Sequence, residues 1–580
     1  MTEKKGWLGE RPLLHDTILI ILLSLPFISP LFNFHWIMVG ESIEQILRLI
    51  ELDRGIREGI LYPRWFGDLA GGFGYPYLIF YAPLVYYVSE MFHLLGFGLL
   101  TSLKWMIYLG VLLSGIGMFL LARAFWGRYG ALVSAVAYIY VPYRMVNLYI
   151  RGDFSEAFAM AFPPLILYFF YRMLRDKRSQ YMAGAVLSYA ALILTHNCTA
   201  LIFSGFLLLF LAFISIQNKN WEGFLRGVLA IIWALGISAI FWLPALVEKK
   251  WVNIHLIYSD ASLDFHNNFI ELFRLLLPTW TFEGGSGGRD LPFQMGWPHI
   301  LLAFFSSLYV MKLEDSTRKD MRQLVLFFLL CTLLAVFLTN GSSILLWENL
   351  PLMKYLQFPW RFLTVLSLFV SFVSGGLFSY FAGTPRLTQK MFQTVLVIII
   401  ILSSIQYCRV KGYYILREEQ LTPAFVKEDG GTISACNTNE MDKITDFGEY
   451  MPKSVKKLPD KMRAGTVFIN KGKARIAAEK AGIQNYEFKI FAQEKTEVIV
   501  GSFYYPSWDG RMDGQPIDLF TDAEGLIHLE VPEGLHEIKV FFGETKVRKI
   551  VKYLSFIALL ALFASLLVRR FTVLRSKSSR

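Results

Sequence analysis

Residues 35–83 read HWIMVGESIEQILRLIELDRGIREGILYPRWFGDLAGGFGYPYLIFYAP and follow directly after the first hydrophobic segment. The stretch carries many charged residues and a glycine cluster at Gly71, Gly72 and Gly74. A segment of this polarity cannot face the hydrocarbon of a bilayer without protein partners. Because most of the remaining chain reads as apolar helix, we interpret this stretch as one wall of a polar site at a membrane surface.

The composition excludes an ordinary soluble domain. Of 580 residues, 54% are hydrophobic and only 18% are charged, and the mean hydropathy is +0.44. Such values predict a polytopic α-helical membrane protein. The formal net charge of +11 does not indicate nucleic-acid binding, because the basic residues gather in short segments between apolar runs and at the C-terminus. That distribution is the one that the positive-inside rule predicts for membrane proteins.

The orientation depends on residues 76–97, which are apolar but interrupted by Pro83, Glu90 and His93. If they lie in the interface rather than crossing the bilayer, every basic loop falls on the cytoplasmic side. This choice predicts about twelve transmembrane helices in the cell membrane, with cytoplasmic N- and C-termini. The predicted spans cover residues 15–33, 102–122, 129–147, 158–174, 181–197, 199–216, 227–247, 298–312, 323–340, 361–382, 391–407 and 551–569.

The opening stretch contains one helical pattern, between Glu41 and Arg57. Its apolar residues recur at helical spacing from Ile43 onward, while Glu41, Gln45 and Arg48 share the opposite face. The pattern predicts an amphipathic helix lying along the membrane.

The C-terminal part has a different pattern. From Gly465 onward, apolar and polar residues alternate in short runs separated by turn signals such as Asp513-Gly514. Alternation of this kind predicts strands, and we expect a small external β-sandwich. The expected organisation is a transmembrane domain at 1–407 with an external loop at 34–101, an external β-rich domain at 408–550, and a final helix with a basic tail at 551–580.

Charged and polar residues at the external ends of the predicted spans are the candidates for chemistry. Several such groups on one side suggest a cavity that binds a polar group attached to a lipid. Each also has a structural alternative, since Asp153 or Ser155 suits a helix N-cap and Arg361 suits snorkelling. The candidates are Glu41, Arg151, Asp153, Glu156, His196, Asn197 and Arg361.

Familiar catalytic motifs do not stand out in the sequence. The glycine cluster is not followed by the Lys-Ser/Thr of a P-loop. We find no nucleotide fingerprint, no zinc spacing and no Ser-His-Asp order. The pair Asp153 and Glu156 gives an Asp-x-x-Glu spacing that could help to hold a divalent ion such as Mg²⁺ or Mn²⁺, and a metal requirement stays open.

A family resemblance covers most of the chain. The order of one span, a long external loop, a basic cytoplasmic hairpin and a short acidic external loop resembles the GT-C membrane glycosyltransferases. Individual motifs resemble the membrane family described as 6-pyruvoyl-tetrahydropterin synthase related, a label that implies no pterin chemistry. These motifs are LYPRW (61–65), GGFGYP (71–76), FYAPL (80–84), RGDFSEAFA (151–159), LTHN (194–197) and QFPWRF (357–362). The region FYYPSWDGRMDG (503–514) resembles the external β-domain of related bacterial membrane proteins implicated in cell-envelope glycosylation.

The resemblance implies an inverting glycosyltransferase with a GT-C-like fold. It would move a sugar from a polyprenyl-phosphate donor onto an external glycan, lipid or protein of the cell envelope. An acid in the first external loop, here Glu41, would be the base, and Asp153 or Glu156 would add a second acid. Arg361 and Arg151 would bind the donor phosphate. The expected substrate pocket would include His196, Asn197, Gln45 and Tyr81.

Two other classes of protein remain open. A transporter or flippase of lipid-linked saccharides would carry its charges near the bilayer midplane and show repeated halves. A non-enzymatic envelope protein that binds glycans would not need Glu41, Asp153 and Arg361 on one side. If these three groups surround one cavity within about 10 Å, a Debye length, the enzyme is favoured.

Overall fold

The computed structural model describes residues 10–176, 178–256, 263–282, 291–313, 319–381, 383–422, 425, 448–457, 459 and 465–578. Within them, eight helices are long and apolar enough to cross a membrane, and three shorter apolar helices cover Leu14–Ser24, Ser179–Thr195 and Trp297–Met311. Every predicted span overlaps one of these helices. The predicted class, a polytopic helical membrane protein with a C-terminal β-sheet region, is confirmed, while the number of crossings stays a prediction.

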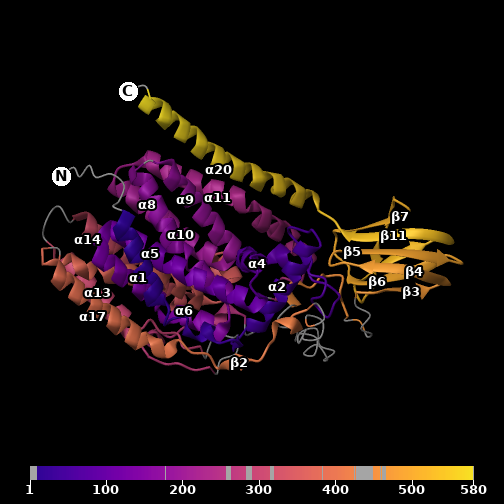
Figure 1. The fold of residues 1–580 in the computed structure, drawn as a ribbon, viewed down its shortest axis with the longest axis horizontal. Helices are drawn as coiled ribbons and strands as arrows, with labels where there is room; N and C mark the ends of the chain where they lie inside the picture. The colour runs from indigo at the N-terminus through magenta and orange to yellow at the C-terminus, as the bar shows by residue number, and fades with distance from the viewer. Residues whose placement is uncertain are drawn as a thin grey trace.

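Apolar helices form the bundle, and α2 and α4 lie at the end of the bundle next to the sheets (Figure 1). The bundle helices are α1 (Glu10–Ser24), α5 (Leu99–Ile139), α8 (Phe162–Asp176), α9 (Ser179–Thr195), α10 (Asn197–Gln217), α11 (Trp221–Glu248), α13 (Trp297–Met311), α14 (Lys319–Thr339), α16 (Leu363–Ser374), α17 (Arg386–Ser404) and α20 (Lys546–Ser578). The segments between them include α2 (Ser42–Arg57), α3 (Tyr77–Phe80), α4 (Leu84–Leu94), α6 (Pro142–Val146), α7 (Phe154–Ala159) and α15 (Ile344–Asn349).

Two predicted spans lie in one helical stretch that is interrupted between them. Residues 102–122 and 129–147 both lie within Leu99–Arg151, which bends at Gly127, where φ is 71°. The first predicted span, 15–33, is wrong in its length, because α1 ends at Ser24. A short 3-10 helix begins at Ser29 with a proline in its first turn. Proline lacks the N–H that an α-helix needs and therefore does not continue one.

The predicted external segments meet at one end of the bundle. Strand β1 (Trp36–Met38) pairs with β2 (Gly412–Tyr414), and the Gly40 N–H donates to the Ile150 carbonyl at 2.8 Å. Arg128, from a predicted cytoplasmic loop, instead pairs with Asp16 of α1 at 2.6 Å. The two sets of loops are therefore separated as expected, and which set faces the cytoplasm stays a prediction.

Helix α2 is not a surface helix, contrary to the expectation from its periodicity. Its polar residues Gln45, Arg48 and Glu51 are buried, as are Ile46 and Leu49. Residues 76–97 form the short helices α3 and α4, neither long enough to span a bilayer. The polar face of α2 is thus directed toward protein groups, and it forms an inner wall rather than a solvated surface.

The C-terminal strands build two antiparallel sheets. One has the order β3-β6-β10-β9 and the other β4-β5-β11-β7-β8. Alternate side chains of β5 are buried, from Tyr486 to Ala492, which is the pattern of one sheet face packed against protein. The strands are β3 (Val467–Lys471), β4 (Ala474–Ala481), β5 (Asn485–Ala492), β6 (Thr496–Phe503), β7 (Trp508–Met512), β8 (Gln515–Ile517), β9 (Phe520–Thr521), β10 (Leu526–Val531) and β11 (Gly534–Phe542).

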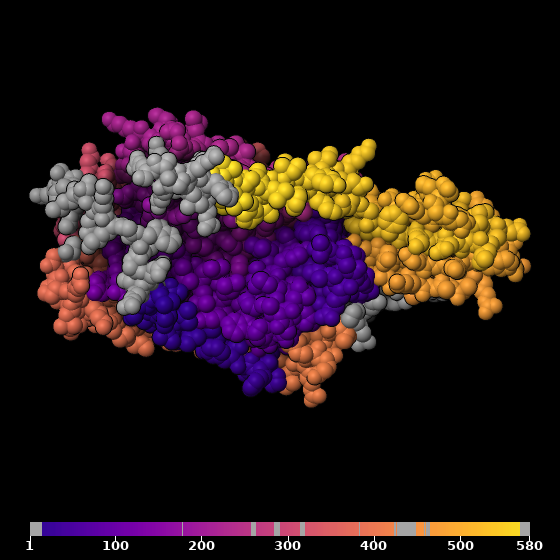
Figure 2. Space-filling view, turned by 45° about the horizontal axis from the view of Figure 1, so that its top comes forward, coloured from indigo at the N-terminus to yellow at the C-terminus, as the bar shows by residue number. Residues whose placement is uncertain are grey.

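The sheets form a lobe beyond one end of the bundle, and α20 lies along the bundle surface (Figure 2). The loop between α2 and α3 forms a seat for this lobe: the ring of Trp65 contacts those of Tyr505, Trp508 and Phe542, and the Phe503 N–H donates to the Phe73 carbonyl at 2.7 Å. The lobe is therefore docked by hydrogen bonds and aromatic packing, and not only tethered by its connections.

A buried ion pair strengthens this attachment. Arg548 of α20 binds both carboxylate oxygens of Glu248, at the end of α11, at 2.9 and 2.6 Å. Tyr505 and Thr545 donate hydrogen bonds to the same carboxylate. We call these four residues the latch. They join the bundle, the lobe and the last helix at one point.

Candidate active site

Two glycines bring the first external loop against the loop that carries the acids. A Cβ on Gly40 would lie 2.2 Å from the Arg151 carbonyl oxygen, and one on Gly152 would lie 2.8 Å from the Glu41 nitrogen. Gly152 also has a φ of 73°, which glycine adopts at low cost. The close approach lets the Glu41 N–H donate to the Arg151 carbonyl at 2.8 Å, so Glu41 is held next to Asp153.

Asp153 and Glu156 begin α7. The Asp153 side chain caps the helix by accepting from the Glu156 N–H at 2.9 Å, as its spacing suggested. Arg151 binds both acids: Nη2 donates to Asp153 at 3.0 Å and Nη1 to Glu156 at 3.0 Å. Glu156 is fully buried and also accepts from the hydroxyls of Tyr143 and Thr364. Both acids are therefore charge-balanced, and Arg151 is occupied in holding them.

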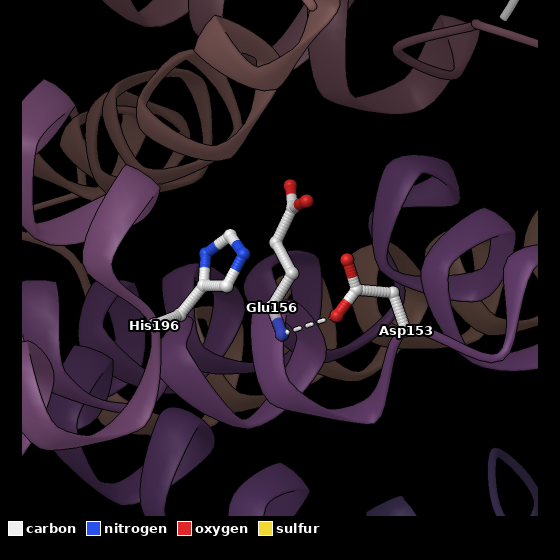
Figure 3. A group of neighbouring side chains, drawn as sticks. All are labelled: Asp153, Glu156 and His196. Atoms are coloured by element: carbon white, nitrogen blue, oxygen red, sulfur yellow. Dashed lines mark hydrogen bonds between the residues drawn. The ribbon is translucent and has the colours of Figure 1, made fainter. Parts of the chain in front are cut away.

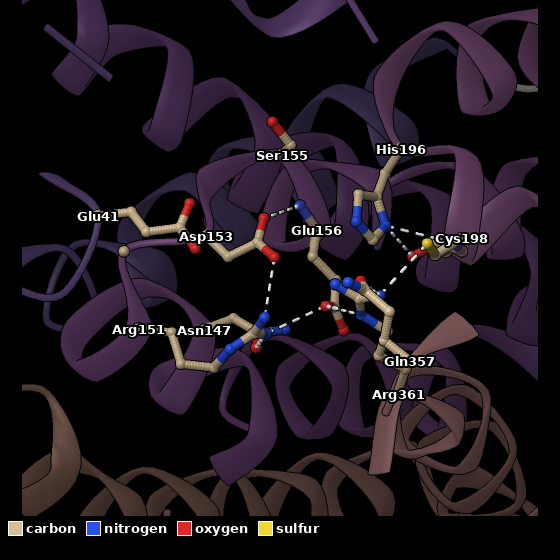
Figure 4. Close-up of polar contacts among 12 residues, drawn as sticks. Glu41, Asn147, Arg151, Asp153, Ser155, Glu156, His196, Cys198, Gln357 and Arg361 are labelled. Carbon is tan, nitrogen blue, oxygen red and sulfur yellow. Dashed lines mark hydrogen bonds and ion pairs between the residues drawn. The ribbon is translucent and has the colours of Figure 1, made fainter. Parts of the chain in front are cut away.

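Arg361 approaches from the opposite side (Figure 4). Its Nη1 donates to the Leu356 carbonyl at 2.8 Å and to the Gln357 side chain at 3.0 Å, and it contacts the Cys198 sulfur at 3.3 Å. Its Nε lies 3.6 Å from Glu156 Oε2. Within the described part of the chain, Nη2 makes no hydrogen bond. Nε also makes no hydrogen bond, so the site holds a buried guanidinium with two nitrogens that make no hydrogen bond.

His196 lies between α9 and α10 and faces the acids (Figure 3). Its Nδ1 accepts from the Thr199 N–H at 3.2 Å and lies 2.7 Å from the Thr199 hydroxyl. One ligand atom each from Asp153, Glu156 and His196 lie within 4.8 Å of one another. Burial lowers the pKa of His196, partly opposed by Asp153, so the ring is neutral at physiological pH.

This triad resembles a metal site in composition, but its hydrogen bonds do not suit one. Asp153 and Glu156 already accept from Arg151, and Glu156 accepts from two hydroxyls as well. An amide N–H can only donate, so Nδ1 of His196 is an acceptor and its proton sits on Nε2. A metal would need that nitrogen unprotonated. The residues present do not fit Mg²⁺ or Mn²⁺.

Glu41 differs from the other two acids. Its side chain is 41% exposed, and its closest cationic neighbour, Arg48, lies at 3.9 Å. Burial of the carboxyl by surrounding protein and the nearby Asp153 charge raise the pKa of Glu41 to about 7. For Asp153, burial is outweighed by Arg151 and further cations, which lower its pKa to about 2. One acid can therefore exchange a proton near neutral pH while its neighbour stays ionised.

The remaining predicted pocket residues are Gln45, Tyr81 and Asn197. Gln45 accepts from the Tyr86 hydroxyl at 2.9 Å and donates to the Gly152 carbonyl at 3.4 Å. Tyr81 donates to Ser155 at 3.3 Å. Asn197 is exposed, and its side chain accepts from the Cys198 N–H, so it turns away from the cluster.

Sequence reasoning missed Arg48 as a site residue. It is buried, its guanidinium lies over the rings of Tyr77 and Tyr81 at 4.8 and 5.1 Å, and Nη1 donates to Tyr86 at 3.3 Å. The signal was present, because Arg48 lies seven residues after Glu41 on the same helical face.

Comparisons with known proteins identify the family of this chain. The family model described as "6-pyruvoyl-tetrahydropterin synthase related domain; membrane protein" matches residues 78–411, more than half of the chain. A protein of Lactococcus lactis subsp. cremoris, described as uncharacterized, is 26% identical over 265 residues. That match covers 44% of this chain and 42% of the relative, so it spans less than half of either.

Three solved structures show a partial likeness. Arabinofuranosyltransferase AftD from Mycobacteria gives a TM-score of 0.43 at 14% identity, over 70% of this chain but only 27% of its own. ArnT from Cupriavidus metallidurans in the apo state gives 0.42 at 15% identity, over 72% and 68%. The same protein bound to undecaprenyl phosphate gives 0.39 at 14% identity, over 73% and 68%. TM-scores this low do not establish a common fold.

Proposed function

Because the chain belongs to the 6-pyruvoyl-tetrahydropterin synthase related family of membrane proteins, we propose from the site that it is a membrane glycosyltransferase. It transfers a sugar, with inversion, from a polyprenyl-phosphate donor to a hydroxyl of an external cell-envelope acceptor. The observation that carries the proposal is a half-exposed Glu41 with a pKa of about 7 beside buried guanidinium groups. The order of spans and loops in the sequence also resembles that of the GT-C enzymes.

Glu41 is the general base in this mechanism. Its ionised carboxylate takes the proton of the acceptor hydroxyl as that oxygen attacks the anomeric carbon. The bond between the anomeric carbon and the phosphate oxygen breaks, and the lipid phosphate leaves with the electron pair. A single displacement inverts the anomer and needs no covalent intermediate. A base works best when its pKa lies near the working pH, and of Glu41 and Asp153 only Glu41 meets this condition.

Arg361 and Arg48 are the groups that we assign to the donor phosphate. Both are buried, and Nη2 of Arg361 makes no hydrogen bond among the described residues. Arg48 has no carboxylate within hydrogen-bond distance, because its nearest acid, Glu41, lies at 3.9 Å. Preorganised guanidinium groups stabilise the charge that develops on a leaving phosphate. Arg151 is already engaged with two acids, so it positions those acids instead.

The site needs no metal under this proposal. Arginine side chains supply the positive charge next to Asp153 and Glu156 that a divalent cation would otherwise supply. We place the site and the lobe of sheets on the external side of the membrane, with both termini cytoplasmic. The lipid chain of the donor remains in the bilayer while its head group enters between the loops.

Sugar transfer in proteoliposomes tests the proposal. Purified full-length protein receives a panel of radiolabelled polyprenyl-phosphate sugars together with envelope material from cells that produce it. Label moving from the lipid to envelope material, with the anomer inverted, is the expected result. No transfer from any donor, combined with movement of lipid-linked sugar across the bilayer, would replace the enzyme with a transporter. No transfer and no movement would contradict both.

A further inference from the structure

The hydrogen bonds of His196 determine the position of its proton. Its Nδ1 accepts from the Thr199 N–H, and a backbone N–H has no acceptor capacity. A neutral imidazole carries one proton, which must then lie on Nε2. The ring is 93% buried, since its relative exposure is 7%, and within the described part of the chain Nε2 forms no hydrogen bond or ion pair. Nε2 is not one of the fully buried unpaired atoms, so a ligand can reach this donor.

The unused donor faces an acceptor that can take a further hydrogen bond. Ligand atoms of His196, Asp153 and Glu156 lie within 4.8 Å of one another, and Figure 3 shows the imidazole ring turned toward the two acids without a hydrogen bond to either. A gap of up to 4.8 Å can hold one bridging oxygen. Asp153 accepts one hydrogen bond on each oxygen, and a carboxylate oxygen can accept a second.

A hydroxyl group matches both sides of this gap, because its oxygen accepts and its hydrogen donates. We propose that Nε2–H of His196 and the carboxylate of Asp153 together bind one hydroxyl group of the sugar substrate. This subsite rests on the proposed glycosyltransferase function and deepens it. It also gives the triad a role other than metal binding: the acids are balanced by Arg151, and the imidazole is a hydrogen-bond donor.

Deoxy-sugar analogues test the subsite by binding, which does not require turnover. The protein in nanodiscs is titrated with polyprenyl-phosphate glucose and with its 2-, 3-, 4- and 6-deoxy forms. We expect one deoxy position to weaken binding by roughly 10- to 100-fold, as for a hydrogen bond to a charged group. His196→Ala should weaken binding of the parent sugar by a similar factor. In this variant, removing the same hydroxyl from the sugar should cause no further loss of affinity. His196→Gln, which keeps an N–H donor, should recover part of the loss.

Asn197→Ala is the matched control, because Asn197 is adjacent in sequence and exposed, and it should leave every Kd unchanged. If the bound hydroxyl belongs to the acceptor, all deoxy forms of the donor will bind with the same Kd. The loss that depends on His196 will then appear in the rate of transfer to deoxy acceptors. Equal losses of His196→Ala on all analogues of both series would overturn the subsite. A loss of affinity that depends on both His196 and one sugar hydroxyl, without any sugar transfer, would support the subsite and contradict the proposed glycosyltransferase function.

A second measurement separates this subsite from a metal site and needs no sugar. Mn²⁺ alone is titrated into the purified protein and followed by electron paramagnetic resonance. We expect no binding that depends on His196, because Nε2 carries the proton. One tightly bound Mn²⁺ in the wild type that is lost in His196→Ala, but retained in Asn197→Ala, would contradict the assignment.

Discussion

Two buried networks of arginine and acid lie at the same end of this molecule, and they differ in how completely they are satisfied. In the latch, Nε and Nη2 of Arg548 bind Glu248, and Nη1 donates to Ser507 and the Gly543 carbonyl. Each oxygen of Glu248 accepts two hydrogen bonds. In the candidate site, Nε and Nη2 of Arg361 and Nε2 of His196 make no hydrogen bond among the described residues.

The difference separates a structural network from a functional one. A buried polar network in which every group is bonded makes a specific and rigid connection. Donors that have no protein partner but that a ligand can reach suit a site that binds something polar. Glu41 also lacks a close partner, because its side chain is 41% exposed and its closest cation is 3.9 Å away. The predictions below test this division.

The largest effect should follow from Glu41→Gln. Removing the base should lower sugar transfer by roughly 10²- to 10⁴-fold, while the thermal unfolding temperature stays near that of the wild type, because the amide is isosteric and no hydrogen bond is lost. Asp53→Asn, on the same helix but paired with Arg57, is the control and should transfer normally. Equal losses in both variants would remove Glu41 from its assigned role.

In contrast to Glu41→Gln, a substitution in the latch should lower the stability of the protein. Glu248→Ala leaves Arg548 buried without its partner and should destabilise the protein by about 3–5 kcal/mol, seen in denaturant unfolding and in faster proteolysis between the lobe and the bundle. The control is Glu544→Ala, which breaks the exposed pair with Lys552 and should cost under about 1 kcal/mol. Similar small effects for both variants would show that the latch does not hold the lobe.

The sequence predicted the class of fold and most of the cluster for one reason. Charged residues at the ends of apolar segments are conspicuous, so Glu41, Asp153, Glu156, His196 and Arg361 could all be selected from the amino-acid sequence alone. Hydroxyls within apolar helices carry no such contrast. Tyr143 and Thr364, which bind Glu156, were therefore missed.

Other features could not be predicted because they depend on long-range packing. Periodicity shows which residues of α2 share a face, but not whether that face meets water or protein, and the exposed-helix interpretation failed there. Arg548 and Glu248 are 300 residues apart, and no local pattern links them. The glycines at 40 and 152 gave no signal either, because the approach of two loops is visible only once both are folded.

Arg361→Met should weaken a charge-assisted hydrogen bond to the donor. We expect the Kd for polyprenyl phosphate to rise by roughly 10- to 100-fold, with the Kd for neutral polyprenol unchanged. Arg361→Lys should retain part of the affinity, because it keeps the charge but loses the guanidinium fork. An equal loss for phosphate and alcohol would mean that the side chain shapes the pocket without binding the phosphate.

A further pair of substitutions concerns the seat of the lobe. A Cβ on Gly74 would lie 2.1 Å from the Trp65 ring, whereas one on Gly59 would meet nothing within 4 Å, and both glycines have φ near +86°. Gly59→Ala should cost about 1–2 kcal/mol from backbone strain, and Gly74→Ala about 1–3 kcal/mol more from overpacking. Equal unfolding free energies for the two variants would mean that Trp65 moves aside freely.

The most direct test of the central claim is the pH dependence of sugar transfer by the wild type and by Glu41→Gln in the same proteoliposomes. The pKa of Glu41 is raised from 4.5 to about 7, so the base is protonated and inactive below that pH and ionised above it. The wild-type rate should rise about tenfold from pH 6 to pH 8, and the low residual rate of the variant should not follow this rise. A variant that keeps the wild-type profile would show that another group accepts the proton, and the assignment of Glu41 would be wrong.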